Sequence, residues 1–460
     1  MPFGAGRSRG GIAGRARGDT VGAMQVTVLG GGGFRVPLVF GALTEAMQST
    51  PATVVLYDVD PHRLQVIAAV CRQLGAGRDA APSVRTTTDL DEALRGADVV
   101  FSAIRVGGVE GRVRDERVAI DAGLLGQETV GPGGLAYAIR TLPVAEEIAA
   151  RISVIAPQAW TINFTNPAGM ITEAMRTHLG DRVFGICDTP IGLVRRVARL
   201  LDVPAHEADA DYQGVNHLGW LTGFWHHGQN LLPDLLADDA RLAALEEARI
   251  LGAQYLRTQG AIPNEYLYYY THRPPAPPRQ TRGEFLAAQQ RAFYAAGPGP
   301  DALERWRAVL RERESTYMAE AREGQRREED MDDGGYHRVA VDLMTALRTG
   351  RPARMILGVA NGGTLPWLSP ESVVEVMCAV DDDGARPLPL RTGPGADQTA
   401  LMQAVKAAEG MLVAAVRERS RSAVVEAFAA HPLVGGDRAA GLLAAYARAE
   451  PEVGRVLTGT

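Results

Sequence analysis

Short apolar runs alternate with amphipathic stretches over the first part of the chain. The runs at 25–29, 53–57 and 182–187 have the pattern of buried strands. The stretches at 61–75 and 168–179 instead repeat apolar residues at helical spacing. Because strands that alternate with helices form a parallel sheet, this pattern predicts an α/β domain with a Rossmann-like parallel sheet.

This alternation ends near residue 201. The later patterns are those of a hairpin at 219–232, a solvated helix at 301–330, a turn at 332–338, strands at 353–363 and 372–380, and Ala-rich helices at 396–449. The chain of 460 residues is long for a single core. We therefore expect a disordered tail at 1–23, a Rossmann-like domain at 24–201 and a second, α+β domain at 202–450.

Composition narrows the range of partners and compartments. The net charge of −6 provides no basic face for nucleic acid. Three widely spaced cysteines argue against a disulfide framework and suit a reducing compartment. No apolar run approaches the roughly 18 residues of a membrane span, and the Gly- and Arg-rich start lacks the apolar segment of a secretory signal. We expect a cytoplasmic protein that binds neither nucleic acid nor membrane.

A glycine-rich turn follows the first strand. Gly30, Gly31 and Gly32 would let the backbone approach a pyrophosphate at a helix N-terminus, although Arg35 replaces the last glycine of the strict G-x-G-x-x-G fingerprint. A flexible turn is the alternative. Asp58 ends the second strand, where a carboxylate can accept hydrogen bonds from the adenosine ribose and favours NAD over NADP. Asp58 could instead cap the following helix.

Polar residues also follow other strands. Arg105 comes directly after the strand that ends near residue 104, where a guanidinium can bind a phosphate or carboxylate, or form a structural salt bridge. Residues 127–129 have the composition of a tight polar loop. Asn163 and Asn166 offer donors and acceptors to a polyhydroxyl ligand, or simply form a turn before a proline.

Cys187 and His217 form a candidate metal site. Thiolate and imidazole suit a borderline transition metal better than Ca²⁺ or Mg²⁺, and two protein ligands would leave positions open for a substrate. Spacing alone favours the alternative that Cys187 is a small buried hydrophobe. Tyr266 opens a run of tyrosines, which usually serve packing, but a nearby metal can lower the pKa of a tyrosine enough for it to act as a base.

Several stretches together resemble the NAD- and divalent-metal-dependent family 4 glycoside hydrolases. In the family's order they are GGGGFRVP, the block from IRVGG to RTLP at 104–143, NFTNPAGMITEA, GICDTPIG, GVNHLGW, IPNEYLYYY and VANGGTLPWLSPESVVEV. The block at 104–143 is the most specific. Family members include 6-phospho-β-glucosidases, 6-phospho-α-glucosidases and α-galactosidases. The predicted architecture is like that of lactate and malate dehydrogenases.

The resemblance implies roles for individual residues. Cys187 and His217 match the protein ligands of the family's metal, usually Mn²⁺, and Tyr266 matches the proposed catalytic base. The positions that hold the substrate and its 6-phosphate are matched by Arg105, Asn166 and Arg282. The dinucleotide turn, and with it an NAD⁺ site, is matched by Gly30, Gly31 and Gly32. Family members are commonly dimers or tetramers, so we expect a homodimer or homotetramer.

Two features point to different anomers of the substrate. Asp188 follows the metal cysteine, where β-specific members often have Asn and where α-specific members have an Asp proposed as the catalytic acid. The segment at 105–117 instead resembles the β-specific type and carries more positions. We therefore favour a 6-phospho-β-glucosidase acting on phosphorylated disaccharides such as cellobiose 6-phosphate. A 6-phospho-α-glucosidase and an α-galactosidase are the alternatives within the family.

The implied mechanism explains why a sugar hydrolase would need NAD. Oxidation at C3 gives a ketone, which acidifies the C2 proton, and the metal stabilises the resulting negative charge. Tyr266 then removes the C2 proton, the C1 substituent is eliminated, water adds and the hydride returns. Two other classes remain as alternatives: an NAD-dependent 2-hydroxy-acid dehydrogenase, which would accumulate NADH, and a non-catalytic NAD-binding regulator.

Overall fold

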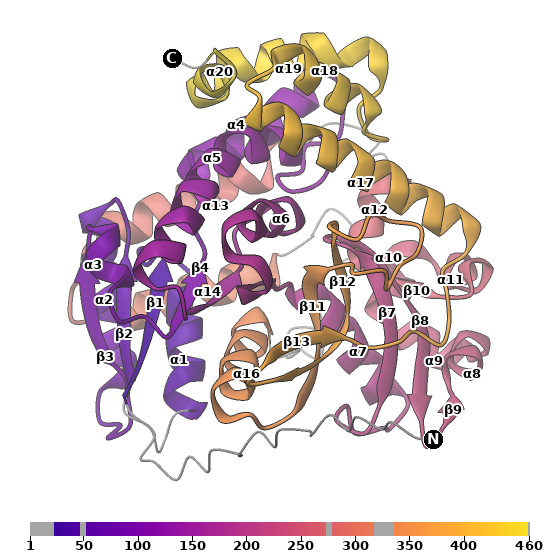
Figure 1. The fold of residues 1–460 in the computed structure, drawn as a ribbon, viewed down its shortest axis with the longest axis horizontal. Coiled ribbons are helices and arrows are strands. Elements are labelled where there is room, and N and C mark those ends of the chain that lie inside the picture. The colour runs from indigo at the N-terminus through magenta and orange to yellow at the C-terminus, as the bar shows by residue number, and fades with distance from the viewer. Residues whose placement is uncertain (1–22, 47–51, 273–277, 317–334, 459–460) are drawn as a thin grey trace, which may run out of the picture.

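The strands of the computed structural model form one mixed sheet of 13 strands (Figure 1). The residues that it describes are 23–46, 52–272, 278–316 and 335–458. The predicted tail, except for residue 23, lies outside these residues, as do 317–330 of the predicted solvated helix.

The N-terminal half of the sheet is parallel, with the spatial order β3-β2-β1-β4-β5-β6. Its strands are β1 (Met24–Leu29), β2 (Ala52–Tyr57), β3 (Ser83–Thr87), β4 (Val99–Ser102), β5 (Trp160–Asn163) and β6 (Val183–Gly185). The helices between and after them are α1 (Val36–Ala46), α2 (Pro61–Gly75), α3 (Leu90–Leu94), α4 (Gly108–Asp121), α5 (Gly131–Ile155), α6 (Ala168–Leu179) and α7 (Asp188–Leu200), with a 3-10 turn η1 (Gly180–Arg182). All strand pairs in this half are parallel, as the βα alternation predicts.

The second half of the sheet is antiparallel and continues from β6 in the order β11-β12-β7-β8-β10. Its strands are β7 (Asp209–Val215), β8 (Leu218–His226), β9 (Gln229–Asn230), β10 (Ile262–Pro263), β11 (Ala353–Ala360), β12 (Val373–Asp381) and β13 (Gly384–Pro387). The predicted fold class is therefore confirmed: a Rossmann-like parallel half is followed by a second α+β half. The predicted hairpin at 219–232 and the predicted strands at 353–363 and 372–380 are also present.

Short helices near β8 and β10, together with longer ones that return to the parallel half, complete the second part of the chain. They are α8 (Leu232–Ala237), α9 (Asp239–Ala244), α10 (Glu246–Leu251), α11 (Ala253–Gln259), η2 (Glu265–Leu267), α12 (Tyr268–Thr271), α13 (Arg282–Ala295), α14 (Ala302–Ser315), α16 (Gly335–Thr349), α17 (Ala396–Arg417), α18 (Arg421–Ala430), α19 (Gly436–Ala449) and α20 (Pro451–Thr458). Helices α17 to α20 lie together along one side of the molecule (Figure 1).

Alternate residues of β1 belong to two different cores. Val26 and Val28 are buried with residues of α1, α2, α14 and α16, whereas Leu29 is buried with residues of α5, α6 and α17. Helices from beyond residue 300 thus cover the sheet formed before residue 201. The domain boundary at 201 and 202 stays a prediction, and the sheet crosses it without a break through the pairing of β6 with β11.

Of two further predictions about the second half, one was wrong and one was confirmed within the described residues. Residues 335–338, predicted as part of a turn, begin helix α16, because the buried ring of Tyr336 stacks on Phe164 with 3.9 Å between ring centroids. The predicted solvated helix is confirmed in its described part as α14, where most residues are exposed or half-buried. Trp306 is an exception, because it is buried and donates a hydrogen bond from its indole nitrogen to the carbonyl of Phe34 at 2.8 Å.

Within the described residues, one helix is long and apolar enough to cross a membrane by length and composition. It is α17, and half of its apolar window is buried inside the molecule. It packs against α5, α6 and α18. One such helix is weak evidence for a membrane span, because a buried core helix passes the same test.

Candidate active site

Two adjoining cavities open at the carboxyl ends of the parallel strands. One has a volume of about 350 Å³ and the other about 570 Å³. They share a wall formed by Arg35, Arg105, Phe164, Asn166, Arg313 and Tyr336. Ligands of open α/β sheets bind at this edge, so two ligands bound here would lie side by side.

The larger cavity lies beside the glycine turn and is called the nucleotide cavity below, after the ligand predicted for it from the sequence. Gly30 has a φ of 79°, and a Cβ there would lie 2.4 Å from the carbonyl oxygen of Ala103. A Cβ on Gly31 would lie 2.7 Å from the Cβ of Leu56. The turn therefore passes between β2 and β4 too closely for any side chain at these positions.

Asp58 also lines the nucleotide cavity, and its carboxylate holds the glycine turn. It accepts hydrogen bonds from the backbone N–H groups of Gly32 at 3.0 Å and Asp60 at 3.1 Å. The cap of helix α2 is Asp60, whose side chain accepts from the N–H of Arg63, so the alternative cap role of Asp58 is wrong. Val59, next to Asp58, is 81% exposed in the same cavity and offers an apolar surface to a flat ligand.

The smaller cavity, called the sugar cavity below after its predicted ligand, brings together the other predicted site residues. They are Arg105, Asn166, Cys187, Asp188, His217, Tyr266 and Arg282. They come from β4, β5, β6, α7, the β7–β8 turn, η2 and α13 or the residues next to them. Sequence positions almost 180 residues apart thus line one cavity, and the roles proposed for these residues stay predictions.

His217 lies at the tip of the β7–β8 hairpin with a φ of 63°. Its side chain is buried, and its Nδ1 has no hydrogen-bond partner among the described residues. Burial lowers the pKa of His217 to about 4, although Asp188 and Glu128 oppose that shift. A neutral imidazole with a free nitrogen is the form that binds a metal.

Cys187 occupies the N-cap position of α7, two residues after the end of β6. Burial, reinforced by the charges of Glu375 and Asp188, raises the pKa of its thiol well above the usual range. A cation bound at the sulfur would therefore have to displace its proton, as metals do when they bind cysteine.

The ring of Tyr266 lies flat against the imidazole of His217. Their centroids are 4.0 Å apart and their planes differ by 2°. Asn264 places Tyr266 by accepting a hydrogen bond from its backbone N–H at 3.1 Å, while the Asn264 amide donates to the hydroxyl of Tyr212 at 3.0 Å. Of the other tyrosines in the run, Tyr269 also lines the cavity.

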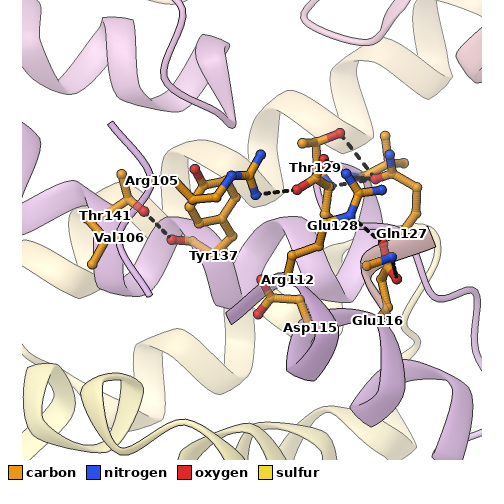
Figure 2. Close-up of polar contacts among 12 residues, drawn as sticks. Arg105, Val106, Arg112, Asp115, Glu116, Gln127, Glu128, Thr129, Tyr137 and Thr141 are labelled. Atoms are coloured by element: carbon orange, nitrogen blue, oxygen red, sulfur yellow. Dashed lines mark hydrogen bonds and ion pairs between the residues drawn. The ribbon is translucent and has the colours of Figure 1, made fainter. Parts of the chain in front are cut away.

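Glu128 joins two arginines at the wall of the sugar cavity. Its carboxylate pairs with Arg105 and with Arg112, as Figure 2 shows. Burial alone would raise the pKa of Glu128, but the two guanidinium groups outweigh it and lower the pKa to about 2. Arg105 is therefore both a salt-bridge residue and a cavity residue, and the predicted polar loop at 127–129 supplies its partner.

Arg282 and Arg313 lie close together and both line the sugar cavity. Arg282 donates hydrogen bonds to Thr316 Oγ1 at 2.6 Å and to the carbonyl of Arg313 at 2.7 Å. Burial, with Arg35 and Arg112 nearby, holds the pKa of Arg313 well below its usual range. Among the described residues no carboxylate pairs with Arg313, so a bound anion would relieve the repulsion between these cations.

The two predicted asparagines have different surroundings. Asn163 is fully buried and serves the turn, because its amide donates to Thr172 Oγ1 at 3.0 Å and its carbonyl accepts from the N–H of Thr165 at 3.0 Å. Asn166 lines both cavities, and its Oδ1 is buried with no hydrogen-bond partner among the described residues. Asn166 therefore has an acceptor available for a ligand.

Models of one protein family match the chain on both sides of residue 210. The family 4 glycosyl hydrolase model matches residues 25–203, and the model of the family's C-terminal domain matches 212–434. The chain belongs to family 4 of the glycosyl hydrolases. The predicted family is thus confirmed.

Named relatives of this family 4 enzyme include enzymes for both anomers. A maltose-6'-phosphate glucosidase from Bacillus subtilis (strain 168) is 30% identical, with 92% of this chain and 94% of the relative covered. A 6-phospho-beta-glucosidase from Escherichia coli (strain K12) is 29% identical, with the same coverage. The solved structure of a 6-phospho-alpha-glucosidase from gut microorganisms, in complex with NAD and Mn²⁺, matches with a TM-score of 0.79 at 25% identity and covers 94% of this chain and 99% of that one.

Both cofactors fit the side chains of this enzyme. The orphaned Nδ1 of His217 and the Cys187 thiol are a soft donor pair for a divalent ion such as Mn²⁺, Co²⁺ or Zn²⁺, facing one cavity. The glycine turn, where a Cβ would collide with β2 and β4, is a cradle for the pyrophosphate of NAD⁺.

The sequence did not identify several residues of the site. Arg35 lies 3.9 Å from Asp188 and 5.6 Å from the Tyr336 ring centroid. Arg35 stands where the strict G-x-G-x-x-G fingerprint has its last glycine, and this departure indicated that the residue has another role. Glu375, on β12, is buried near Cys187, and burial raises its pKa to about 7. The local sequence does not indicate that Glu375 belongs near the site, because the residue lies within an ordinary strand pattern.

Proposed function

We propose that this enzyme is a cytoplasmic 6-phospho-β-glucosidase that hydrolyses phosphorylated disaccharides such as cellobiose 6-phosphate. The observation that carries the proposal is the shared wall between the nucleotide cavity and the sugar cavity. A nicotinamide and a sugar placed in adjoining cavities are in reach of each other, as oxidation of the sugar requires. The 6-phospho-glucosidase names of the relatives support a phosphorylated substrate.

The residues of the sugar cavity would have different roles in the reaction. When bound, NAD⁺ supplies a reversible hydride acceptor, and a divalent cation supplies a Lewis acid for the sugar oxygens. Cys187 and His217 would hold the cation. Tyr266 would take the proton from C2 of the sugar through its phenolic oxygen.

Cationic side chains would orient the phosphate. Arg105 and Arg282 are positioned by hydrogen bonds to Glu128 and Thr316, so they meet a ligand without losing much rotamer freedom. Arg313 adds a positive charge that no described carboxylate neutralises. Asn166 would accept from a sugar hydroxyl through its free Oδ1.

A 6-phospho-α-glucosidase is the second candidate, because Asp188 resembles the residue proposed as acid in α-specific members. In the fold, Asp188 lies 3.9 Å from Arg35. The segment at 105–117, which resembles the β-specific type over more positions, favours the β assignment. An α-galactosidase remains the third candidate in the family.

The test is an activity panel of p-nitrophenyl α- and β-glucosides and galactosides, each with and without a 6-phosphate. Reactions are run with NAD⁺ and Mn²⁺ present or omitted. We expect the 6-phospho-β-glucoside to react fastest, and only with both cofactors. Faster release from the α-anomer would overturn the β assignment, and release without NAD⁺ would overturn the redox mechanism.

Two alternatives from other classes make different predictions in the same panel. A 2-hydroxy-acid dehydrogenase would accumulate NADH, and the absorbance at 340 nm would rise. The proposed reaction returns the hydride to the sugar, so the absorbance at 340 nm would show no net change. A non-catalytic regulator would release no nitrophenol at all. Membership of a glycosyl hydrolase family supports the hydrolase.

The proposed compartment and assembly have separate support. Cys71, Cys187 and Cys378 are all free and buried, which suits a reducing cytoplasm. We propose a homodimer or homotetramer, and light scattering of the purified protein at several concentrations would measure the mass of the assembly.

A further inference from the structure

Three metal-binding side chains meet on the surface, outside the cavities described above. His226 ends β8, His227 begins the β8–β9 turn, and Glu207 lies in the loop that leads into β7. Their ligand atoms all lie within 4.8 Å of one another. No other group of three or more such residues with this spacing occurs among the described residues.

The backbone conformation of the turn explains how two neighbouring histidines can face one metal ion. Successive side chains of a strand normally point to opposite faces. His227 instead has a φ of 48°, which turns its ring back towards His226. The two ring centroids are 3.9 Å apart, with planes inclined by 39°.

Glu207 approaches the two histidines from another segment of the chain. Its Oε2 lies 3.5 Å from His226 Nε2, and its Oε1 lies 3.6 Å from the Nε2 of the exposed His206. His226 Nε2 is buried and forms no hydrogen bond with the described residues. Two imidazoles and a carboxylate with such separations leave room for an ion between them after small side-chain rotations.

We propose that Glu207, His226 and His227 form a second divalent-metal site of this enzyme, selective for Zn²⁺ or a similar transition ion. Two neutral imidazoles and one carboxylate are a common ligand set of zinc, whereas Mg²⁺ and Ca²⁺ prefer oxygen ligands. Water would complete the coordination. The site is open to solvent on the side of Glu207 and His227, so ions exchange with the medium.

The location indicates what the bound ion would do. Strand β8 begins directly after His217 and ends at His226, so the proposed site lies at the far end of a strand that begins at the sugar cavity. Glu207 follows α7, whose N-terminus carries Asp188. A bound ion would therefore fasten the loop after α7 to the β8–β9 turn, and stabilise the part of the fold that carries the sugar-cavity residues.

The experiment counts zinc on the untagged full-length protein by isothermal titration. Wild type is compared with H226Q/H227Q, with C187S and with H178Q, a control at an exposed histidine on α6. We expect about two zinc ions per chain for wild type and H178Q, and about one for H226Q/H227Q and C187S. Zinc should raise the Tm of C187S, and this rise should vanish when H226Q/H227Q is added.

The outcomes separate this site from the proposed catalytic one. If H226Q/H227Q still binds two zinc ions, or if C187S binds none, the second site does not exist. If C187S still binds two ions, the proposal for Cys187 fails while the second site stands. With Mn²⁺ and NAD⁺ supplied, H226Q/H227Q should retain wild-type activity, because these residues touch neither cavity.

Discussion

Some arginines of the sugar cavity have a carboxylate partner within the protein, and Arg313 has none among the described residues. Arg105 and Arg112 share the carboxylate of Glu128, and Arg35 lies near Asp188. Arg313 has no carboxylate partner among the described residues. This excess of positive charge at the wall between the two cavities suits phosphate groups, which both proposed ligands carry.

Replacing Tyr266 with Phe should remove the proposed base while leaving the ring stacked on His217. We expect kcat to fall roughly 100- to 10,000-fold, the range attributed to a general base, with little change in NAD⁺ affinity. Steady-state kinetics and NAD⁺ titration measure both quantities. Tyr269→Phe, in the same cavity, is the matched control and should retain most activity. Equal losses in the two variants would exclude Tyr266 as the base.

Replacing Glu128 with Gln should leave Arg105 and Arg112 without a counter-charge. We expect the free energy of unfolding to fall by about 3 kcal/mol, since one member of a buried charge cluster is lost. An anion can replace the lost carboxylate, so sulfate should raise the Tm of this variant more than that of wild type. Glu110→Gln, which breaks an exposed pair with Arg291, is the control and should change stability little. An equal response of all three proteins to sulfate would contradict the prediction.

The β7–β8 hairpin of the second half positions His217, one of the two proposed metal ligands. The β7–β8 hairpin is pinned beside its tip by Asn216, which donates from Nδ2 to Glu375 on β12 at 2.9 Å. The Oδ1 of Asn216 accepts from the N–H of Ala168 at 3.1 Å. One side chain thus ties the turn of His217 both to the neighbouring strand and to the start of α6.

The C-terminal helices contain a buried histidine that should make stability depend on pH. His431, at the C-terminus of α18, is buried, and its Nδ1 accepts from the N–H of Leu433 at 3.1 Å. Burial lowers the pKa of His431 to about 4. The unfolded chain therefore binds the proton more readily, and stability is present above a pH of about 6.5 and is lost as the pH falls towards 4.

His431→Asn should keep an acceptor for the Leu433 N–H but remove the titrating group. We expect the difference in the free energy of unfolding between pH 7 and pH 4.5 to shrink by about 2 kcal/mol. Denaturant titrations at the two pH values measure this difference. Replacement of the exposed His178 with Asn is the control, and a similar effect there would show that burial is not the cause.

The arrangement of the whole molecule creates the shared wall between the two cavities. Arg35 and Arg105 come from the parallel half, whereas Arg313 and Tyr336 come from α14 and α16, which return from beyond residue 300 to cover that half. Neither cavity is complete without both parts of the chain. A ligand in either cavity would therefore lie against residues that also line the other.

Replacing Arg313 with Gln should weaken two ligands together. We expect the Kd values of NAD⁺ and of glucose 6-phosphate to rise about ten-fold each, because one charge-assisted contact is worth about 1.5 kcal/mol or more. Titration calorimetry measures both constants. Arg311→Gln, an exposed site on the same helix, should leave both unchanged. An effect of Arg313→Gln on one ligand alone would contradict its place in the shared wall.

Local patterns of apolar residues were sufficient to predict strands of the parallel half, but they were insufficient to predict several helices. The strands of β1, β2 and β6 were predicted because buried parallel strands are continuous apolar runs. No helix was predicted over α4 or over the start of α5, where glycines such as Gly133 and Gly134 have low helix propensity. At these positions a Cβ would lie 2.2 Å from the carbonyl oxygen of Gln127 and 2.6 Å from that of Thr129, so close packing requires glycine there.

The sequence by itself determined the fold class, the family and the residue types that could bind a metal, because these depend on local patterns and short motifs. Only the tertiary structure decided that Glu128 neutralises Arg105, that Tyr266 lies against His217 and that Arg313 closes the wall between two cavities. These contacts join residues far apart in the chain, and no local pattern records which distant side chain will meet which.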